Sequence, residues 1–597
     1  MTGIKKINLI SAVLVSLSLC GGCTLEKAGN SSQDQAVQED NETEQVKTEK
    51  AEKEEINEMH LRDKDSLYEN ADDTSVVTMY LTVSKGNSSE NTYHTWKEIN
   101  SYSVYDYEDM GVERYQVAGL LQVGDENGPI EGEVGYGESV PNATVQIRGQ
   151  TSSQNAQKNY KIELKKNKGT WRGQRTINLN KHMTEGMRFR NKLAYDLIRG
   201  IPQMVGLRTQ FVHLYVKDNT EESDGKFEDY GIYTQVEQLN KTALKSHGLD
   251  SNGQLYKINS FEFYRYEDII KKEDDAGYDK TAFEKMLEIK GDSDHTKLID
   301  MLTDLNDYSI GIEDVLKEHF DEENIVYWMA FQILMGNVDT QNRNVYLYSP
   351  LNSDIWYFIA WDNDGCLMRP EYELRNFSDQ NSWEKGISNY WGNILFQRCL
   401  KSDAFREKLD QVIEELRRYL SEERLEEMVE QYAGVVQPYV EKMPDQLNEP
   451  LTPEEYEQVK AGLPKEVEQN YEMYRESLEK PMPFYIGRPV TENGKLKINW
   501  DASYDFDAED ITYSVEIARD YQFTQVIYKE EQTLIPEILV DIPDPGQYFV
   551  RIRATNESGK TQDAFDYYVT NTGKQYGMIC FYINEDHTVG VDAYEEE

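Results

Sequence analysis

The chain has 597 residues, more than one hydrophobic core supports, so two or more folded units are expected. It carries 109 acidic against 63 basic residues, a net charge of −46, and such an acidic surface repels a phosphate backbone, which makes nucleic acid a poor candidate partner. The hydrophobic content of 38% is enough to build cores. No CxxC pair occurs, so no zinc site is indicated, and Cys366, Cys399 and Cys580 are expected to be buried free thiols.

The N-terminus carries an export signal. Two lysines precede an apolar run over residues 7–19, which has the length of a signal-peptide core and is short for a bilayer-spanning helix. Two glycines stand directly before Cys23, and this resembles a bacterial lipobox, in which the Cys becomes lipidated. Cys20 stands where that pattern favours Leu, which leaves ordinary secretory cleavage as the alternative. We therefore predict a lipoprotein signal peptide over residues 1–22 and an exported chain, lipid-anchored at the bacterial cell membrane and facing outward.

Residues 23–74 are rich in Gln, Glu, Lys, Ser, Asn and Asp and almost free of aromatic side chains. Such a segment cannot bury enough apolar area to order itself, so we predict a disordered acidic and polar tether.

From residue 75 the chain alternates short β-branched and aromatic runs with turns rich in Gly, Asn and Ser, which is typical of an antiparallel sheet. A helix is predicted over residues 188–201, because apolar side chains recur there at helical spacing. The runs that predict strands lie at 76–83, 115–123, 143–149, 160–166, 211–216 and 230–238.

Farther along, helical periodicity dominates, interrupted by two strands at 344–349 and 356–362. Amphipathic helices are predicted at 294–308, 313–320, 323–336 and from 402 to 480. Residues 75–480 are therefore expected to form an α+β domain with two lobes, β-rich to about residue 275 and helix-rich after it.

After prolines at 481 and 483, strand periodicity returns and favours a β-sandwich over residues 484–575. The stretch 544–559, DPGQYFVRIRATNESG, resembles the late strands of a fibronectin type III module. Residues 576–597 are predicted to form a C-terminal β-hairpin or tail.

The chemistry is concentrated in GNVDTQNRNVYLY and WYFIAWDNDG. Asp339 follows an apolar helix and Asn344 stands five positions later, the separation that protein kinases use between the catalytic Asp and a metal-binding Asn. Asp362 ends the second strand, where a kinase carries its metal-binding Asp. Two acids at the ends of neighbouring strands suit Mg²⁺, which takes carboxylates together with phosphate oxygens.

These residues also fit simpler explanations. Asp and Asn in DTQN are ordinary turn residues that cap a helix or form an Asx-turn, and DNDG is also a plain tight turn. A calcium loop starting at Asp362 does not fit, because Cys366 replaces an oxygen ligand and Leu367 stands where Gly is needed.

Six motifs in order decide between these explanations. They are VQIRGQTSSQNAQKNYKIEL, RFRNKLAYDLI, YGIYTQVEQ, LYK, GNVDTQNRN and WDNDG. Across about residues 76–400 the chain thereby resembles the CotH kinase family. The resemblance implies an atypical protein-kinase fold, ATP between the lobes, and phosphate passed to Ser or Thr of surface or coat proteins.

By the same resemblance Asp339 is the catalytic Asp, Asn344 a metal or loop ligand, and Asp362 the ligand of Mg²⁺ or Mn²⁺. Asp364 either shares the metal or only closes the turn.

In the first lobe the family covers the nucleotide phosphates with a segment that corresponds to Arg148, Gly149, Ser152 and Ser153. This segment has no GxGxxG pattern, so a plain hairpin turn is the alternative.

A lysine is needed for the α- and β-phosphates, and Lys158 and Lys161 are both candidates. Strand alternation places them on opposite faces, and the family position favours Lys158. Glu237 either anchors this lysine or contacts the nucleotide near the hinge, and Arg190 orients phosphate. A solvated salt bridge is the alternative for each of these last two.

The sequence thus predicts an extracytoplasmic protein kinase. The alternative is a catalytically inactive, kinase-like surface adhesion lipoprotein, but an adhesin has no need of Asp339, Asn344 and Asp362 together. Glycoside hydrolysis has no positive support, since a catalytic pair cannot be recognised among 109 acidic residues.

Overall fold

The computed structural model describes residues 61–69, 71–222, 225–375, 383–570 and 573–591. The predicted signal peptide, Cys23 and the tether as far as residue 60 lie outside these residues. Within the described ranges, no helix is long and apolar enough to cross a membrane.

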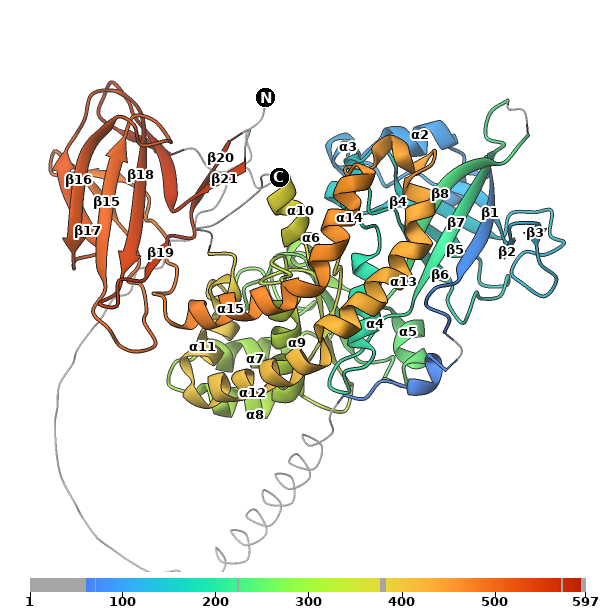
Figure 1. The fold of residues 1–597 in the computed structure, drawn as a ribbon, viewed down its shortest axis with the longest axis horizontal. Coiled ribbons are helices and arrows are strands. Elements are labelled where there is room, and N and C mark those ends of the chain that lie inside the picture. Colours follow the sequence, from blue (N-terminus) through green and yellow to red (C-terminus); the bar gives the residue numbers. More distant parts are fainter. Residues whose placement is uncertain (1–60, 70, 223–224, 376–382, 571–572, 592–597) are drawn as a thin grey trace, which may run out of the picture. The chain divides into compact units, whose positions relative to one another are not determined.

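The first lobe is a strongly curved sheet whose strands close into a ring (Figure 1). The order is β1-β7-β8-β6-β5-β4-β2-β3, and β1 pairs with β2 as well as with β7. All pairings are antiparallel except β1 with β7, so the predicted antiparallel sheet is correct for every pair but one. The strands are β1 Val76–Ser84, β2 Val117–Asp125, β3 Gly128–Pro129, β4 Ala143–Arg148, β5 Asn159–Leu164, β6 Thr176–Asn180, β7 Thr209–Asp218 and β8 Glu228–Glu237.

Alternate residues of these strands point into the ring and form one apolar cluster, as period-2 patterning requires. Arg148 on β4 and Lys161 on β5 belong to the opposite set, outside this cluster. Short helices precede, connect and follow these strands: η1 Asp65–Leu67, η2 Ser88–Glu90, α2 Trp96–Ser101, α3 Val104–Met110, η3 Thr151–Gln154, α4 Arg190–Ile198 and α5 Lys241–Ser246.

The packed chain begins before the boundary predicted near residue 75. Leu61 is buried in the large apolar cluster, and Asp63 receives hydrogen bonds from Tyr68 and from the ring of His247. Asp73 pairs with Arg199 at 2.6 Å. Residues 61–74 were predicted to belong to the tether from their polar composition. The prediction failed because Arg199 and His247, which contact Asp73 and Asp63, lie more than 100 residues away in the sequence.

The second lobe is built on a four-stranded antiparallel sheet in the order β10-β9-β11-β12. Its strands are β9 Gln254–Ile258, β10 Leu287–Ile289, β11 Val345–Ser349 and β12 Tyr357–Ala360. Because β9 pairs with β11 rather than with the first sheet, the lobe boundary lies soon after β8, earlier than the predicted position near residue 275.

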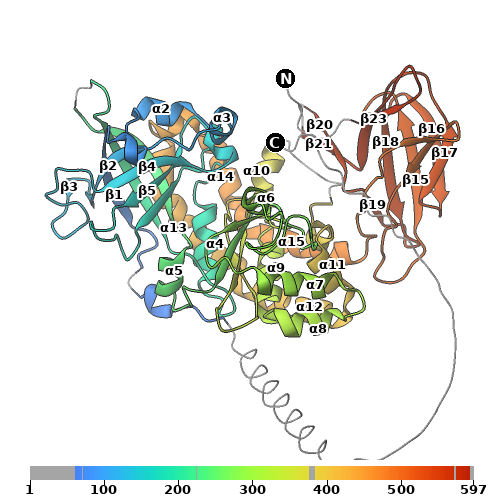
Figure 2. The same ribbon diagram turned by 180° about the vertical axis from the view of Figure 1, so that it is seen from behind.

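Helix α9, Glu322–Leu334, runs through the middle of this lobe (Figure 2). The side chain of Asp321 caps its N-terminus by accepting from the backbone N–H of Asn324 at 3.0 Å. Eleven of its residues are buried, which explains why the sequence there is apolar all round. The other helices in this part of the chain are α6 Lys280–Met286, α7 Thr296–Asn306, α8 Ile312–His319, α10 Arg369–Leu374, η4 Gly386–Tyr390 and α11 Ile394–Lys401.

Four α-helices follow, as the amphipathic pattern from residue 402 predicted. Ser402, Ser421 and Thr452 cap three of them with their side-chain oxygens. These elements are α12 Asp403–Tyr419, α13 Glu422–Val440, η5 Asp445–Asn448, α14 Pro453–Gly462, η6 Leu463–Lys465 and α15 Glu466–Leu478.

The C-terminal region contains two larger sheets and a small hairpin. One sheet has the order β13-β14-β17, and the other β16-β15-β18-β22-β23 with β19 paired to β18. A single apolar cluster includes residues of both sheets. The strands are β13 Val490–Glu492, β14 Lys495–Asn499, β15 Thr512–Ala518, β16 Val526–Thr533, β17 Glu537–Asp541, β18 Gly546–Thr555, β19 Thr561–Asp563, β20 Tyr567–Thr570, β21 Gly573–Tyr576, β22 Met578–Ile583 and β23 Val589–Val591.

Two details of this region differ from the sequence prediction. The C-terminal strands β22 and β23 do pair as a hairpin, but β22 also pairs with β18 and so completes the second sheet. Phe565 packs in the large cluster of the two lobes, and its carbonyl accepts from the indole N–H of Trp383 at 2.9 Å. Cys366, Cys399 and Cys580 are buried and form no disulfide with one another, as predicted.

Candidate active site

The hairpin of β11 and β12 brings the predicted catalytic and metal-binding residues together. Val345 pairs with Ala360, so the residues just outside this pair, Asn344 and Trp361, lie side by side at the open end. The backbone N–H of Trp361 donates to the carbonyl of Asn344 at 3.2 Å. Asp362 therefore lies beside Asn344 although the two are separated by a whole hairpin.

Asp339 lies in the loop between α9 and β11, where Asn344 orients its carboxylate. The amide Nδ2 of Asn344 donates to Asp339 Oδ2 at 2.9 Å, and Arg343 Nε lies 3.6 Å from Oδ1. The Asp339 side chain exposes 60% of its surface. Partial desolvation still raises its pKa above the usual value, although the charge of Arg343 opposes this. The Asp339 carboxylate is thus accessible to solvent while Asn344 fixes its orientation.

Asp362 and Asp364 lie close enough for their charges to interact. Burial, followed by the charge of Asp364, raises the pKa of Asp362 to about 6. Burial also disfavours the charged form of Asp364, but the contact of its Oδ2 with His182 Nδ1 at 3.4 Å outweighs burial and holds its pKa below the usual value. Two neighbouring carboxylates in partly desolvated surroundings are what a divalent cation stabilises.

Several residues of the site adopt backbone conformations that L-amino acids avoid. Asn344 and Asp362 both have φ of 56°, and His182 has φ of 48°. Each left-handed non-glycine residue costs on the order of 1 kcal/mol, and such strain is concentrated at functional sites. Asn344 contacts Asp339, and His182 contacts Asp364, so left-handed residues accompany both acidic loops of the candidate site.

A chain of buried amides joins the two loops of the site. Gln332 on α9 accepts from Asn337 Nδ2 at 3.0 Å and donates to Asn363 Oδ1 at 3.2 Å. The backbone N–H of Asn363 donates to Asn191 on α4 at 3.1 Å. A Cβ on Gly365 would lie 2.8 Å from Asn337 Oδ1, so only Gly allows the loops to approach this closely. The loop that carries Asp339 is thereby fixed relative to the loop that carries Asp362.

Tyr195 on α4 also positions the metal-binding loop. Its hydroxyl accepts from the backbone N–H of Asp362 at 3.1 Å, and its side chain is 1% exposed. This contact satisfies the backbone at a strained residue.

Arg148 lies at the site. Gly149, Ser152 and Ser153 instead form a turn whose serine hydroxyls are already hydrogen-bonded to neighbouring residues of the first lobe. The Arg148 guanidinium lies 5.9 Å above the ring centre of Trp361, the residue before Asp362. Gly149 has φ of 92° and leaves no room for a Cβ beside Ser152 Oγ. Ser152 Oγ accepts from Asn159, while Ser153 Oγ accepts from the backbone N–H of Val104 and donates to the carbonyl of Gln150.

The two candidate lysines, Lys158 and Lys161, make contacts away from the carboxylates of the site. Lys158 is buried and its Nζ donates to the carbonyl of Ser153 at 2.6 Å. Lys161 pairs with Glu163 at 3.1 Å on a half-exposed face. Neither contacts Asp362.

Glu237 and Arg190 are likewise engaged in buried contacts away from the carboxylates of the site. Glu237 pairs with Arg208 and lies 2.9 Å from His247 Nε2, and these partners lower its pKa to about 2 despite burial. Arg190 contacts Glu185 at 2.6 Å and Glu371 at 2.8 Å. Arg190 still supports the site, because its Nε donates to the carbonyl of Leu367 and so fixes the end of the loop that starts at Asp362.

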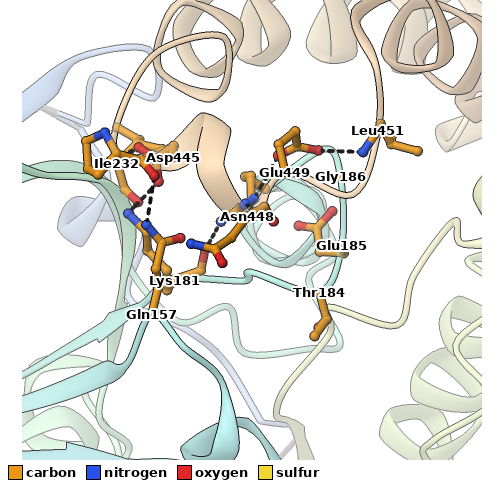
Figure 3. Close-up of polar contacts among 12 residues, drawn as sticks. Gln157, Lys181, Thr184, Glu185, Gly186, Ile232, Asp445, Asn448, Glu449 and Leu451 are labelled. Carbon is orange, nitrogen blue, oxygen red and sulfur yellow. Dashed lines mark hydrogen bonds and ion pairs between the residues drawn. The ribbon is translucent and has the colours of Figure 1, made fainter. Parts of the chain in front are cut away.

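A second polar cluster fixes the segment 181–188, which carries His182 (Figure 3). Lys181 pairs with Asp445 of η5 at 2.5 Å, and Asp445 Oδ2 also accepts from the backbone N–H of Ile232 at 2.9 Å. Arg188 pairs with Glu449 at 3.2 Å. The segment after α13 is thus attached to the loop that contacts Asp364 through His182.

Comparison with known proteins identifies the class. The CotH kinase protein family matches residues 145–474, which include both lobes' site residues. The match covers more than half of the chain, so the chain belongs to this family, and this membership supports a kinase-like fold and function. Over 273 residues the chain is 24% identical to the inner spore coat protein H of Bacillus subtilis (strain 168), covering 45% of this chain and 69% of that protein.

Two solved structures share only a distant likeness. One is the Helicobacter pylori proinflammatory kinase CtkA, with 11% identity, a TM-score of 0.24, and coverage of 53% of this chain and 94% of that one. The other is the toxin–antitoxin complex of HipA, HipB and operator DNA from Shewanella oneidensis MR-1, with 10% identity, a TM-score of 0.20, and coverage of 50% and 60%. Similarity at this level carries no functional information.

Proposed function

We propose that the chain is an atypical protein kinase that transfers the γ-phosphate of ATP to Ser or Thr hydroxyls of surface or coat proteins. The observation that carries the proposal is the convergence of Asp339, Asn344 and Asp362 at the open end of one hairpin, within the region that matches the family. A protein kinase needs these three residue types in this relation.

Asp339 accepts the proton of the acceptor hydroxyl as the oxygen attacks phosphorus and ADP leaves. Its exposed carboxylate is positioned for this role by Asn344 Nδ2 and is not buried against another cation. Burial raises the pKa of Asp339, and the charge of Arg343 on the same loop opposes this rise.

Asp362, with Asn344 and Asp364, would hold Mg²⁺ or Mn²⁺. No group of three or more His, Cys, Asp or Glu side chains in the described residues forms a candidate metal site of its own. Two carboxylates and an amide nevertheless fit Mg²⁺, because it is a hard cation that prefers oxygen ligands. When bound, the metal neutralises the phosphate charge that develops during transfer.

The cellular location follows from the N-terminal signal. We place the chain outside the cytoplasm, anchored through lipidated Cys23, and we propose that residues 484–575 form a fibronectin type III-like β-sandwich. Support comes from the lipobox-like sequence, the two sheets with a shared apolar cluster, and a relative that is a spore coat protein.

The test is incubation of the purified chain with γ-labelled ATP and Mg²⁺, with and without a Ser-rich acceptor such as casein. We expect label in the chain or the acceptor that requires Mg²⁺, resists hydroxylamine as phosphoserine and phosphothreonine do, and is absent in Asp339→Asn and Asp362→Asn. Saturable ATP binding by a chain that labels neither itself nor any acceptor would favour the inactive adhesion lipoprotein.

A further inference from the structure

The hairpin of β20 and β21 belongs to the C-terminal region but packs on the large apolar cluster of the two lobes. Among the described strands, β20 and β21 pair only with each other, outside both larger sheets. Tyr567 and Tyr576 lie directly opposite each other in this hairpin, and both pack against the large cluster. Phe565, just before β20, is buried in the same cluster. The hairpin therefore joins the C-terminal region to the part of the chain that carries Asp339.

Hydrogen bonds from the C-terminal region hold Trp383 and Glu384. The indole N–H of Trp383 donates to the carbonyl of Phe565 at 2.9 Å, and the two rings pack edge-on with their centres 5.1 Å apart. Lys574 Nζ donates to Glu384 Oε1 at 2.7 Å, and the Tyr576 hydroxyl donates to Glu384 Oε2 at 2.7 Å. Both carboxylate oxygens of Glu384 are thus bound by the hairpin, which fixes the backbone that follows.

The backbone after Glu384 lines a pocket together with the catalytic loop, residues 335–344 between α9 and β11. The lining includes Lys385 and Gly386 as well as Asn337 and Val338. Because Val338 directly precedes Asp339, this pocket lies beside the proposed catalytic carboxylate. Burial raises the pKa of Asp339, and the nearby charge of Lys574 is among those that oppose this rise. The hairpin thus reaches the surroundings of the catalytic loop.

Tyr485 brings a second part of the C-terminal region to the same loop. Its ring centre lies 4.7 Å from that of Phe565. Burial, and next the charge of Glu262, raise the pKa of the Tyr485 hydroxyl, so Glu262 lies near it. Glu262 in turn accepts from the side-chain amide of Asn342 at 2.6 Å, and Asn342 is part of the catalytic loop. A path of contacts therefore joins Tyr485 to the loop that carries Asp339.

This neighbourhood presents exposed tyrosines to solvent. Tyr485 is 50% exposed, and Tyr264, two residues after Glu262, is 42% exposed. A tyrosine offers a rigid apolar ring with a polar tip, and such residues are enriched where proteins bind polypeptides. An acceptor hydroxyl has to reach Asp339, so the polypeptide on either side of it lies over surfaces that adjoin the catalytic loop.

We propose that the C-terminal region forms part of the binding surface for the polypeptide that carries the acceptor hydroxyl, with Tyr485 contacting this polypeptide and Lys574 as a positioning residue. The proposal rests on the proposed kinase function. Lys574 acts through Glu384, whose position sets that of the pocket-lining residues after it. Tyr485 and the hairpin lie beyond residue 474, where the match to the family ends. They therefore add to the catalytic core a contact that the matched family region does not include.

The experiment compares Tyr485→Ala with Tyr136→Ala in the whole chain, with casein as the acceptor. Tyr136 is a matched control, because it is 49% exposed and lies in the first lobe between β3 and β4. We expect Tyr485→Ala to raise the KM for casein about five- to thirtyfold, the range for truncating a central interface side chain, with kcat within about twofold. Tyr136→Ala should leave both unchanged. Calorimetric titration should give the same MgATP affinity for all three chains.

The positioning role of Lys574 is tested by Lys574→Met and Lys574→Arg. Lys574→Met should raise the KM for casein about two- to fivefold, as expected for a partly exposed ion pair, without changing kcat or MgATP affinity. Lys574→Arg still pairs with Glu384 and should restore most of the wild-type KM. An unchanged KM in Lys574→Met, or no recovery in Lys574→Arg, would remove this role.

The anisotropy of fluorescently labelled casein measures binding without turnover. The wild-type chain should bind casein, and Tyr485→Ala should weaken this binding by the factor seen in KM. Casein binding that depends on Tyr485 in a chain that labels no protein would keep the surface and remove the kinase function. Labelling of casein with the same KM and affinity in wild type and Tyr485→Ala would keep the kinase function and overturn the surface. A chain that neither binds nor labels casein would overturn both.

Discussion

The cations of the two lobes fall into two groups with opposite surroundings. Lys181, Arg188 and Arg190 are buried, and each contacts a carboxylate at 3.2 Å or less. Arg114, Arg148 and Lys257 lie around the candidate site and contact no carboxylate among the described residues. Both groups consist of Lys and Arg. The presence of a contacting carboxylate therefore distinguishes a cation that stabilises the fold from one that is available to a ligand.

The largest effect is expected at Asp362, where two carboxylates lie close together. Asp362→Asn keeps the shape of the side chain, and Asn tolerates the left-handed backbone at φ 56°. Phosphotransfer and Mg²⁺-dependent ATP binding should fall by at least about 10²-fold, because one fixed electrostatic contact to the transition state is lost. The melting temperature should stay within about 3 °C, since removing a charge beside Asp364 relieves repulsion. Radiometric assays measure the loss of phosphotransfer, and calorimetry measures the melting temperature. An unfolded variant would show that Asp362 has a structural role.

The reverse behaviour is expected in the paired group. Arg190→Met removes the cation from buried Glu185 and leaves Glu371 the contact with Arg375, and breaking such a buried pair typically costs about 3–5 kcal/mol. Urea unfolding should show this loss. Arg148→Met is the matched control, because it removes the same side chain from a position without an ion pair, and it should change the unfolding free energy by less than about 1 kcal/mol. Equal destabilisation by Arg190→Met and Arg148→Met would contradict the distinction between cations with and without a contacting carboxylate.

A smaller, pH-dependent effect is expected at Glu449 (Figure 3). Burial raises the pKa of Glu449 to about 8, against the charge of Arg188, whereas an unfolded glutamate titrates near 4.5. Between these values the folded chain binds more protons than the unfolded chain, so this group stabilises the fold most at low pH and its contribution declines from about pH 4.5 to 8. Glu449→Gln mimics the protonated form and should remove that decline, so the variant should melt a few degrees above wild type at pH 8 and equal it near pH 4.5. A variant less stable than wild type at pH 8 would show that the Arg188 pair is charged and net favourable.

Much of the site was predictable because its residues are close in sequence. The separation of Asp339 and Asn344 by five, and the placement of Asp362 after a short hairpin, predicted the convergence that the register of β11 and β12 produces. Helix α9 and the capped helices from Ser402 were also clear from local periodicity and polar N-terminal residues.

The remainder depended on contacts between distant segments. Arg190 was expected to orient phosphate. Its partner Glu371 lies 181 residues away, and no local sequence pattern indicates such a pair. The proximity of Lys257, in the LYK motif, to Asp362 was missed, because it comes from β9 pairing with β11 rather than with the first sheet. Closure of the first sheet through β1 and β2 was missed for the same reason. The lipoprotein anchor and the fibronectin type III-like module stay predictions.

Asp339→Asn tests the central claim most directly, because it preserves the side-chain shape and removes only proton acceptance. Turnover of labelled ATP should fall about 10²- to 10⁴-fold, the usual range for a general base, while MgATP affinity stays within about twofold of wild type. A parallel loss of MgATP affinity that high Mg²⁺ restores would make Asp339 a metal ligand instead. Wild-type turnover in Asp339→Asn would contradict the kinase mechanism.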